Sequence, residues 1–249
     1  MISLLFAVMQ EQLAVFSFLY FFMMLTFDYF NKKLIGMRKY SLAIIVSFIG
    51  ILSAKFSPEN AIRLESEVNS WFPTFKEVGL LNRIGLAFTD TNYYLFAKPL
   101  LFILFFVILI ILISIFKKKI IATVLGIFIL INMFSASINL PSLYRPLRAW
   151  AEHFMQTHEL SPFLNTLFIT SISIITLLAI IFIIWSISNE TKFFITNTFI
   201  LAIGYIGRML ISFSPTMYAS GIRTLMPIML AIFIVSINLI EQETKRRIS

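Results

Sequence analysis

Long apolar stretches that few charges interrupt are the feature that most constrains how this chain can fold. Of its 249 residues, 59% are hydrophobic and only 13% are charged, whereas soluble domains average about 45–50% and about 25%. A soluble enzyme built around one core is therefore excluded, and so is intrinsic disorder, which requires low hydrophobicity. The pattern predicts an all-α, polytopic helical membrane protein.

Seven stretches are long enough to cross about 30 Å of hydrocarbon, a distance that takes about 20 helical residues. They are Ile2–Phe27, Tyr40–Ala54, Tyr94–Phe116, Ile120–Leu140, Leu164–Ser188, Phe193–Phe213 and Thr224–Ile240. Residues 1–249 are predicted to form a single transmembrane domain without internal repeats. The lipid bilayer is its predicted partner.

The connecting segments differ in their density of basic residues. One set comprises 28–39, 117–119, 189–192 and 241–249, and the other comprises 55–93, 141–163 and 214–223. The first set holds 11 Lys and Arg in 28 positions, whereas the second holds 7 in 72. The positive-inside rule predicts that the first set is cytoplasmic. We therefore expect the N-terminus outside and the C-terminus in the cytoplasm. The same rule explains the net charge of +8, so no nucleic-acid partner is predicted.

Two of the predicted outer loops are long, and both carry apolar residues at helical spacing. In loop 55–93 the pattern covers Asn60–Asn69 and Lys76–Phe88, with Trp71 between them. In loop 141–163 one helix face would carry Leu143, Leu147, Trp150, Ala151 and Phe154. We expect these to be short helices on the membrane surface. Because the outer loops are the longer ones, we expect function on the outer face.

Motifs of soluble enzymes are absent from the sequence. The chain has no Cys, which excludes disulfides and thiolate chemistry. His153 and His158 stand five residues apart and would not share a helix face, so we interpret them as loop residues rather than metal ligands. No cofactor is predicted, and a divalent metal is left open.

Three charged residues at the outer ends of the predicted spans are the best candidates for a site. They are Glu11 in the first span, Arg208 in the sixth, and Arg223 in the hairpin before the last. Placing a charge inside a membrane costs about 2.5–3.5 kcal/mol on insertion scales, which makes such residues functional candidates. Two guanidinium groups suit a phosphate, and a nearby carboxylate suits general-base work on a sugar hydroxyl.

Each candidate also has a simpler interpretation. Arg208 could extend to the interface or pack against Glu11, while Gly204 and Gly207 would let a neighbouring helix approach closely. Lys98, which precedes Pro99, could reach the outer interface.

The segment Ser57–Arg63 follows the second span directly. Pro58 would end the extended exit from that span, and Asn60 is a candidate helix cap. Arg63 either belongs to an ordinary helix start or adds a third cation at the outer mouth.

Several short motifs resemble the second half of a bacterial family of uncharacterised multi-pass membrane proteins. The matching residues are Gln10-Glu11-Gln12-Leu13-Ala14, then Ser57-Pro58-Glu59-Asn60-Ala61-Ile62-Arg63, then Ser214-Pro215-Thr216 with Arg223. That family is grouped with the O-antigen glucosyltransferase-like members of the GT-C superfamily, which transfer a sugar from a polyprenyl-phosphate carrier to a cell-surface glycan. Two departures are Glu59, where the family has Gly, and the family's early spans, which have no counterpart here.

The resemblance implies a GT-C-like glycosyltransferase of the bacterial plasma membrane, or a truncated or split half of one. By resemblance, Glu11, Asn60, Arg63 and Arg223 would line the outer cavity, and Arg208 joins them because of its burial cost. Glu11 or a loop carboxylate would be the base, and the arginines would hold the carrier phosphate. The alternatives are a non-catalytic subunit of a larger membrane complex, with a second membrane protein as partner, and a transporter or flippase.

Overall fold

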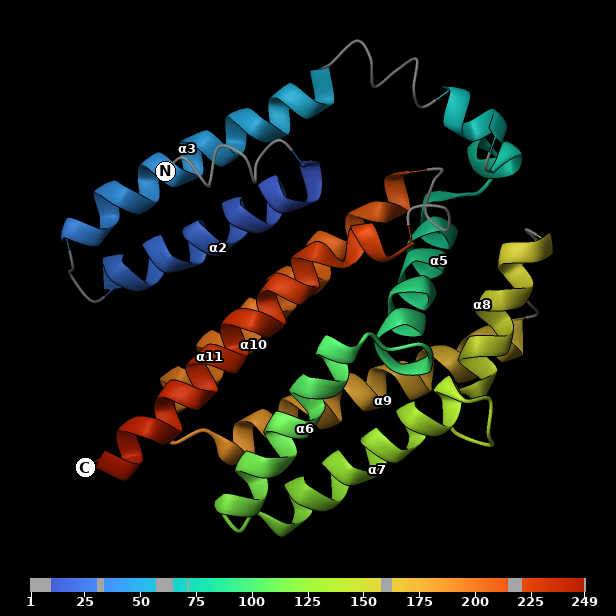
Figure 1. Cartoon of the computed structure of the whole chain (residues 1–249). Helices are drawn as coiled ribbons and strands as arrows, with labels where there is room; N and C mark the ends of the chain where they lie inside the picture. Colours follow the sequence, from blue (N-terminus) through green and yellow to red (C-terminus); the bar gives the residue numbers. More distant parts are fainter. Residues whose placement is uncertain are drawn as a thin grey trace. The chain divides into compact units, whose positions relative to one another are not determined.

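The structure is a computed structural model that describes residues 10–30, 34–56, 65–70, 72–157, 163–214 and 221–248. In these residues the backbone forms helices and turns and no β-strand, which confirms the predicted all-α fold (Figure 1). The α-helices are α2 (Glu11–Phe30), α3 (Leu34–Phe56), α5 (Leu80–Asn92), α6 (Leu101–Phe116), α7 (Ile120–Ser137), α8 (Arg145–Thr157), α9 (Phe163–Ile187), α10 (Thr191–Met209) and α11 (Met226–Ile248). Shorter elements are η1 (Pro73–Lys76), the π-helix η2 (Tyr93–Ala97), η3 (Leu210–Phe213) and η4 (Gly221–Leu225).

Within the described ranges, six helical stretches are long and apolar enough to cross a membrane. A seventh is added if the bent pair Leu80–Ala97 and Leu101–Phe116 is counted as one span. The six are Glu11–Phe30, Gly36–Ala54, Ile120–Ser137, Leu167–Ile187, Thr191–Phe213 and Gly221–Arg246. The chain is therefore a multi-pass helical membrane protein, as its composition predicts. The orientation from the positive-inside rule stays a prediction.

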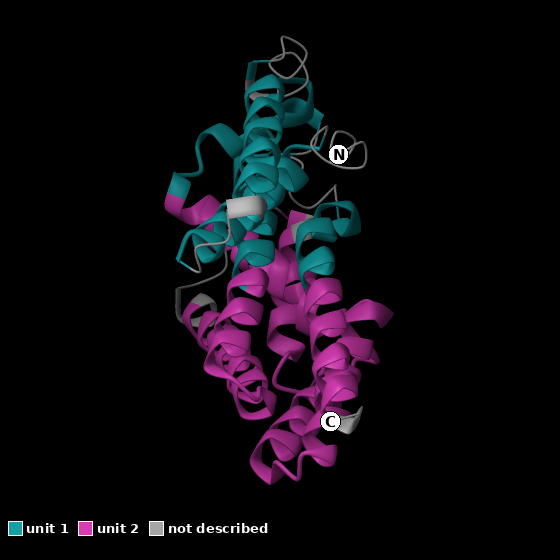
Figure 2. Cartoon of the chain, turned by 90° about the vertical axis from the view of Figure 1, so that its left-hand side faces the viewer, with its two compact units in different colours: residues 1–80, 202–231 teal, residues 81–201, 232–249 magenta. Residues whose placement is uncertain are grey.

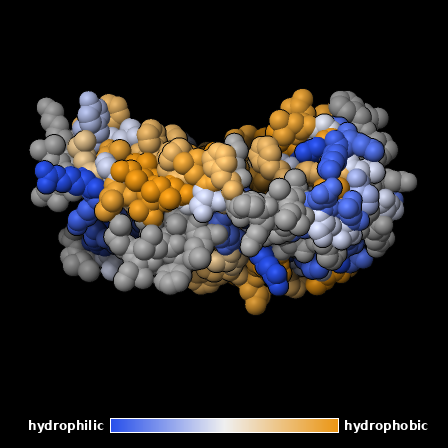
Figure 3. Space-filling view, turned by 90° about the horizontal axis from the view of Figure 1, so that it is seen from above, coloured by the Kyte–Doolittle hydropathy of each residue, from blue (hydrophilic) through white to orange (hydrophobic). Residues whose placement is uncertain are grey.

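Large apolar side chains stay exposed along these helices. Leu42, Ile45, Phe48 and Ile49 on α3 are all exposed, although they lie in a helix that packs on α2. Apolar residues form broad patches on the face shown in Figure 3. Helices that are apolar on their outer side are typical of membrane proteins, because lipid tails cover that side.

The chain divides into two compact units, coloured separately in Figure 2. Unit 1 comprises residues 1–80 and 202–231, and unit 2 comprises residues 81–201 and 232–249. The helices α10 and α11 each contribute residues to both units.

In unit 1, two glycines of α10 allow close helix packing, as the sequence predicts. A Cβ at Gly204 would lie 2.4 Å from the Ala231 Cβ and 3.0 Å from the Pro227 carbonyl oxygen of α11. A Cβ at Gly207 would lie 3.0 Å from the Pro227 Cβ and 3.6 Å from the Gln12 carbonyl oxygen. The end of α10 therefore meets the start of α11 and the start of α2.

In unit 2, the helices α6, α7 and α9 pack side by side (Figure 1). A Cβ at Gly126 of α7 would lie 2.6 Å from the Ile111 Cγ1 of α6, so this pair also approaches closely. The contact faces are apolar, with Ile110, Met133 and Ile183 fully buried.

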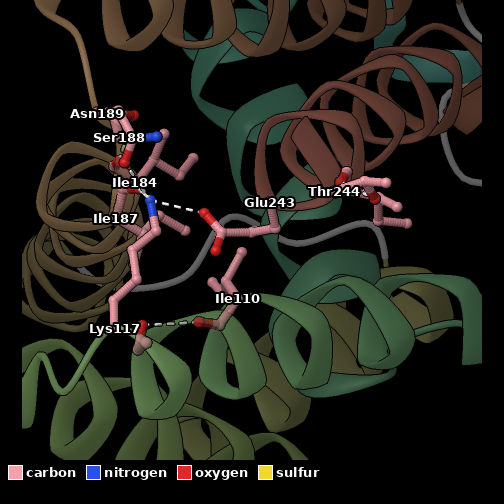
Figure 4. Close-up of polar contacts among 10 residues, drawn as sticks. Ile110, Lys117, Ile184, Ile187, Ser188, Asn189, Glu243 and Thr244 are labelled. Atoms are coloured by element: carbon pink, nitrogen blue, oxygen red, sulfur yellow. Dashed lines mark hydrogen bonds and ion pairs between the residues drawn. The ribbon is translucent and has the colours of Figure 1, made fainter. Parts of the chain in front are cut away.

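Lys117, in the turn between α6 and α7, is a structural residue rather than a solvated loop cation. Its side chain is only 4% exposed, and its Nζ lies 2.7 Å from the Glu243 Oε1 of α11. The same ammonium donates to the Ile187 carbonyl at the end of α9 and to the Asn189 Oδ1 at 2.6 Å (Figure 4). One side chain thus joins the ends of three helices, whereas Lys118 and Lys119 are exposed.

We expect Gly204→Ala to destabilise the protein by about 1–3 kcal/mol, because the new methyl group would press on the backbone of α11. The matched control is Gly85→Ala in α5, where nothing lies within 4 Å of the added Cβ. That control should be stabilising by about 0.5–1 kcal/mol, since alanine is the better helix former. The measurement is the free energy of unfolding in detergent micelles. Equal effects of the two substitutions would contradict the close packing.

We expect Lys117→Met to lower the free energy of unfolding by about 3–5 kcal/mol, because it leaves the Glu243 carboxylate largely buried without its ammonium. Lys119→Met removes the same charge from an exposed position of the same turn, and should change stability by less than about 0.5 kcal/mol. Both values come from unfolding in micelles. If Lys119→Met lowers the free energy of unfolding as much as Lys117→Met does, stability depends on the total charge of the turn and not on this ion pair.

Candidate functional site

The predicted third span, Tyr94–Phe116, is not one continuous helix. The helix α5 runs directly into η2, and the helical structure is interrupted at Lys98–Leu100. The helix α6 then starts at Leu101, and the angle between Leu80–Ala97 and Leu101–Phe116 is 66°. The Lys98 N–H bonds to the Tyr93 carbonyl at 2.7 Å, which is the five-residue spacing of a π-helix. Pro99 explains the break, because proline has no N–H and disfavours a helical conformation in the residue before it.

A run of polar residues lies buried just before this break. Thr89, Asp90, Thr91, Asn92 and Tyr93, which we call the polar segment, are each at most 3% exposed. Three of these side chains bond to their own helix: Thr89 Oγ1 to the Gly85 carbonyl, Thr91 Oγ1 to the Ala87 carbonyl, and Asn92 Nδ2 to the Phe88 carbonyl. Asp90 brings a carboxylate into the same buried stretch. Polar side chains beside a π-helical turn often mark a functional site.

The helix α8 carries an ion pair toward the polar segment. Arg148 Nε donates to Glu152 Oε1 at 2.8 Å, and the Arg148 Nη1 donates to the Ala136 and Ser137 carbonyls at the end of α7. The Arg148 guanidinium thereby caps the negative end of α7. Tyr93 lies within electrostatic range of Glu152, Arg148 and Asp90. With a side chain 44% exposed, Glu152 is a solvent-accessible carboxylate beside the polar segment.

The helix predicted in loop 141–163 is confirmed as α8, and its apolar face packs on protein. Leu147, Trp150, Ala151 and Phe154 are all buried, whereas Leu143, which precedes the helix, is 43% exposed. The helix contacts η2. The apolar face of α8 is therefore covered by protein, and its position at the membrane surface stays a prediction.

Next to this face, Tyr144 forms a buried polar contact with α9. Its hydroxyl lies 3.0 Å from the Thr176 Oγ1, which itself donates to the Ile172 carbonyl at 2.8 Å. Because the threonine proton is used, the Tyr144 O–H is the donor between them. The Tyr144 ring stacks on Phe96 of η2, with 5.4 Å between centroids. Burial raises the pKa of Tyr144 to about 12.

In loop 55–93 the described helices differ from the predicted ones. Residues 65–70 are helical, and α5 begins and ends later than the predicted Lys76–Phe88. Trp71 lies outside the described residues, as does His158. His153 lies on α8, and it is exposed.

The residues singled out from the sequence belong to unit 1. Glu11 is exposed as the first residue of α2, Arg223 is exposed in η4, and Ser214 is half-buried after η3. Arg208 is 0% exposed, so its side chain does not extend to solvent. The other simple interpretation, packing of Arg208 against Glu11, stays a prediction. Pro58, Asn60, Arg63 and Pro215 lie outside the described residues.

The sequence pattern does not single out the polar segment or Glu152, because they fall in the predicted outer loops 55–93 and 141–163 and not in a predicted span. The available signal was the run Thr89–Tyr94 directly before an apolar stretch, followed by Pro99. A polar run joined to a proline at the edge of a span indicates a broken helix.

In the part of the chain that the structure describes, no group of three or more His, Cys, Asp or Glu side chains could hold a metal ion. Comparison of the chain with protein families, with curated proteins and with solved structures finds no match in any of the three.

We expect Tyr144→Phe to lower the free energy of unfolding by about 0.5–1.5 kcal/mol at neutral pH, the usual net value of one hydrogen bond. The pKa of Tyr144 is higher in the fold than its ordinary value of 10.0, so folding favours the protonated phenol. The wild-type protein should therefore keep this contribution below pH 10 and lose it as the pH rises toward about 12.

The phenylalanine variant lacks that alkaline loss. Tyr29→Phe is the matched control, because the Tyr29 side chain is 65% exposed. Unfolding in micelles at a series of alkaline pH values gives the free energy of unfolding against pH for the wild-type protein and both variants. An alkaline slope that Tyr144→Phe leaves unchanged would show that this phenol does not titrate with unfolding.

Proposed function

We propose that this protein is a GT-C-like glycosyltransferase of the bacterial plasma membrane, complete or as one half of a split enzyme. It would transfer a sugar from a polyprenyl-phosphate carrier to a cell-surface glycan. The observation that supports this proposal is that the segments bearing Glu11, Arg208 and Arg223 converge within unit 1.

The convergence is carried by close backbone contacts. Gly207, which precedes Arg208, lies against Pro227 of α11 and against the carbonyl of Gln12, which follows Glu11. Arg223 stands just ahead of Pro227, in η4. Residues far apart in the sequence thus come from elements that meet at one end of α10, as residues of a common site must.

The two arginines suit a lipid-linked phosphate in different ways. Arg208 is fully buried in a helix that is long and apolar enough to cross a membrane. A charge in that position is a functional candidate because it is costly to keep there. Arg223 is exposed on a short 3-10 turn, where a phosphate can reach it. A guanidinium offers two parallel N–H donors to phosphate oxygens.

Glu11 would act as the general base. The acceptor hydroxyl oxygen would attack the anomeric carbon of the sugar and pass its proton to the Glu11 carboxylate. The bond from that carbon to the phosphate oxygen would break, and the polyprenyl phosphate would leave with the electron pair. Because Glu11 is exposed at the start of α2, an acceptor can approach it.

Transport is the second candidate, and the broken helix of unit 2 favours it. Transporters commonly place interrupted helices and buried ionisable groups at their substrate sites. The polar segment, with Asp90 fully buried before the break at Lys98–Leu100, has both properties.

We expect Glu11→Gln to lower surface-glycan transfer by about 10²–10⁴-fold, the usual contribution of a general base. Arg223→Ala should weaken carrier binding roughly tenfold, the value of one charge-assisted contact. The first measurement is mass spectrometry of the surface glycan in cells whose only copy of this protein is the variant. The second is mass spectrometry of the polyprenyl phosphate that the purified protein retains. Arg38→Ala is the matched control, since Arg38 is an exposed arginine of α3 in the same unit.

Unchanged glycan in Glu11→Gln and Arg223→Ala, at normal membrane levels, would overturn the transferase proposal. Transport would be supported instead by a proton flux into dye-loaded proteoliposomes that Asp90→Asn abolishes and Arg223→Ala preserves.

A further inference from the structure

We propose that a pocket at the lysine-rich end of unit 2 binds a phospholipid head group that combines a phosphodiester with a primary amine, as in phosphatidylethanolamine. This proposal is independent of the transferase proposal, because it rests on different residues and a different unit.

The pocket has a volume of about 620 Å³ and lies among the α9–α10 turn, the start of α10 and the end of α11. Pockets of about 300–1,000 Å³ are typical of small-ligand sites. Phe193 provides an apolar contact, and the remaining lining residues are polar or charged. The Lys117 contacts to Asn189 and Glu243 hold the α9–α10 turn next to α11 (Figure 4).

The lining carries charges of both signs in equal number. Glu190 and Glu241 are acidic, and Lys245 and Arg246 are basic. A purely anionic head group would meet two carboxylates here, whereas a zwitterionic one finds a partner for each of its charges. Because the carboxylates accept hydrogen bonds, a primary ammonium with three N–H donors fits better than a quaternary ammonium, which has none.

Two further observations point to a polar ligand. Both side-chain amide atoms of Gln242 are buried and lack a hydrogen-bond partner among the residues that the structure describes. Such an amide can donate to a phosphate oxygen and accept from an ammonium. Lys245 pairs with Glu241 at 2.6 Å, but both side chains are more than half exposed. Exposed pairs of this kind contribute little, so their partners can exchange for a ligand.

The position of the pocket suggests that the ligand is a membrane lipid. It lies at the ends of apolar helices that are candidate spans, α9, α10 and α11. Exposed Lys118 and Lys119 lie in the turn between α6 and α7, which Lys117 joins to these helix ends, and exposed Lys192 lies at the start of α10. Basic residues at such helix ends lie at the level of the lipid head groups.

The test is lipid retention by the purified full-length protein, measured by native mass spectrometry. The protein is equilibrated in micelles with equal amounts of phosphatidylethanolamine, phosphatidylglycerol and phosphatidylcholine. We expect roughly a tenfold preference for phosphatidylethanolamine, the factor set by one charge-assisted hydrogen bond. The double variant Glu190→Gln with Glu241→Gln should lose this preference and shift toward phosphatidylglycerol, because it keeps the cations and removes the anions.

The matched control is Glu65→Gln with Glu77→Gln, which removes two exposed carboxylates of unit 1 and should keep the wild-type preference. Gln242→Leu, which leaves the charges in place, should weaken phosphatidylethanolamine retention without favouring phosphatidylglycerol. Equal or stronger retention of phosphatidylglycerol or phosphatidylcholine by the wild-type protein would overturn the proposal. So would displacement of the lipid by an equal concentration of soluble phosphoethanolamine, which would identify a water-soluble ligand.

Discussion

The need to satisfy backbone hydrogen bonds inside each helix is the constraint on which this structure depends. In hydrocarbon, an unpaired N–H or carbonyl costs several kcal/mol, so only continuous helices cross without help. The interruption at Lys98–Leu100 departs from that rule, and nearby groups supply hydrogen bonds and cover for the backbone there. The Lys98 N–H bonds back in π-helical spacing to the Tyr93 carbonyl, and both α7 and α8 pack against η2.

The same need explains how polar side chains are handled around the break. The hydroxyls of Thr89 and Thr91 donate to carbonyls of their own helix. Arg148 satisfies two carbonyls that the end of α7 leaves open, while it also holds Glu152. Each of these contacts satisfies a polar group that the helix end or the burial would otherwise leave unpaired. Together they place an accessible carboxylate beside a buried polar run.

Electrostatics divide one lysine cluster into two roles. Lys117 is withdrawn from water by a carboxylate and by the carbonyl end of α9, where the helix dipole favours a cation. Lys118 and Lys119 remain exposed and can contribute to orientation. The three adjacent lysines count equally as loop charges, but in the fold Lys117 is buried in an ion pair whereas Lys118 and Lys119 are exposed.

Helix type, most span positions and the close approach at Gly204 follow from the sequence alone, because apolar length and small residues act locally along the chain. The face of α8 that carries Leu147 and Phe154 is also visible in its spacing. What covers that face, the bend between η2 and α6, the burial of Asp90 and the partner of Lys117 were decided only by tertiary structure. Each of these depends on which segments meet, and pairings between distant helices leave no periodic trace in one sequence. The same limit explains why Arg208 could be chosen for its burial cost, whereas Glu152 could not be chosen until α8 was seen against the broken helix.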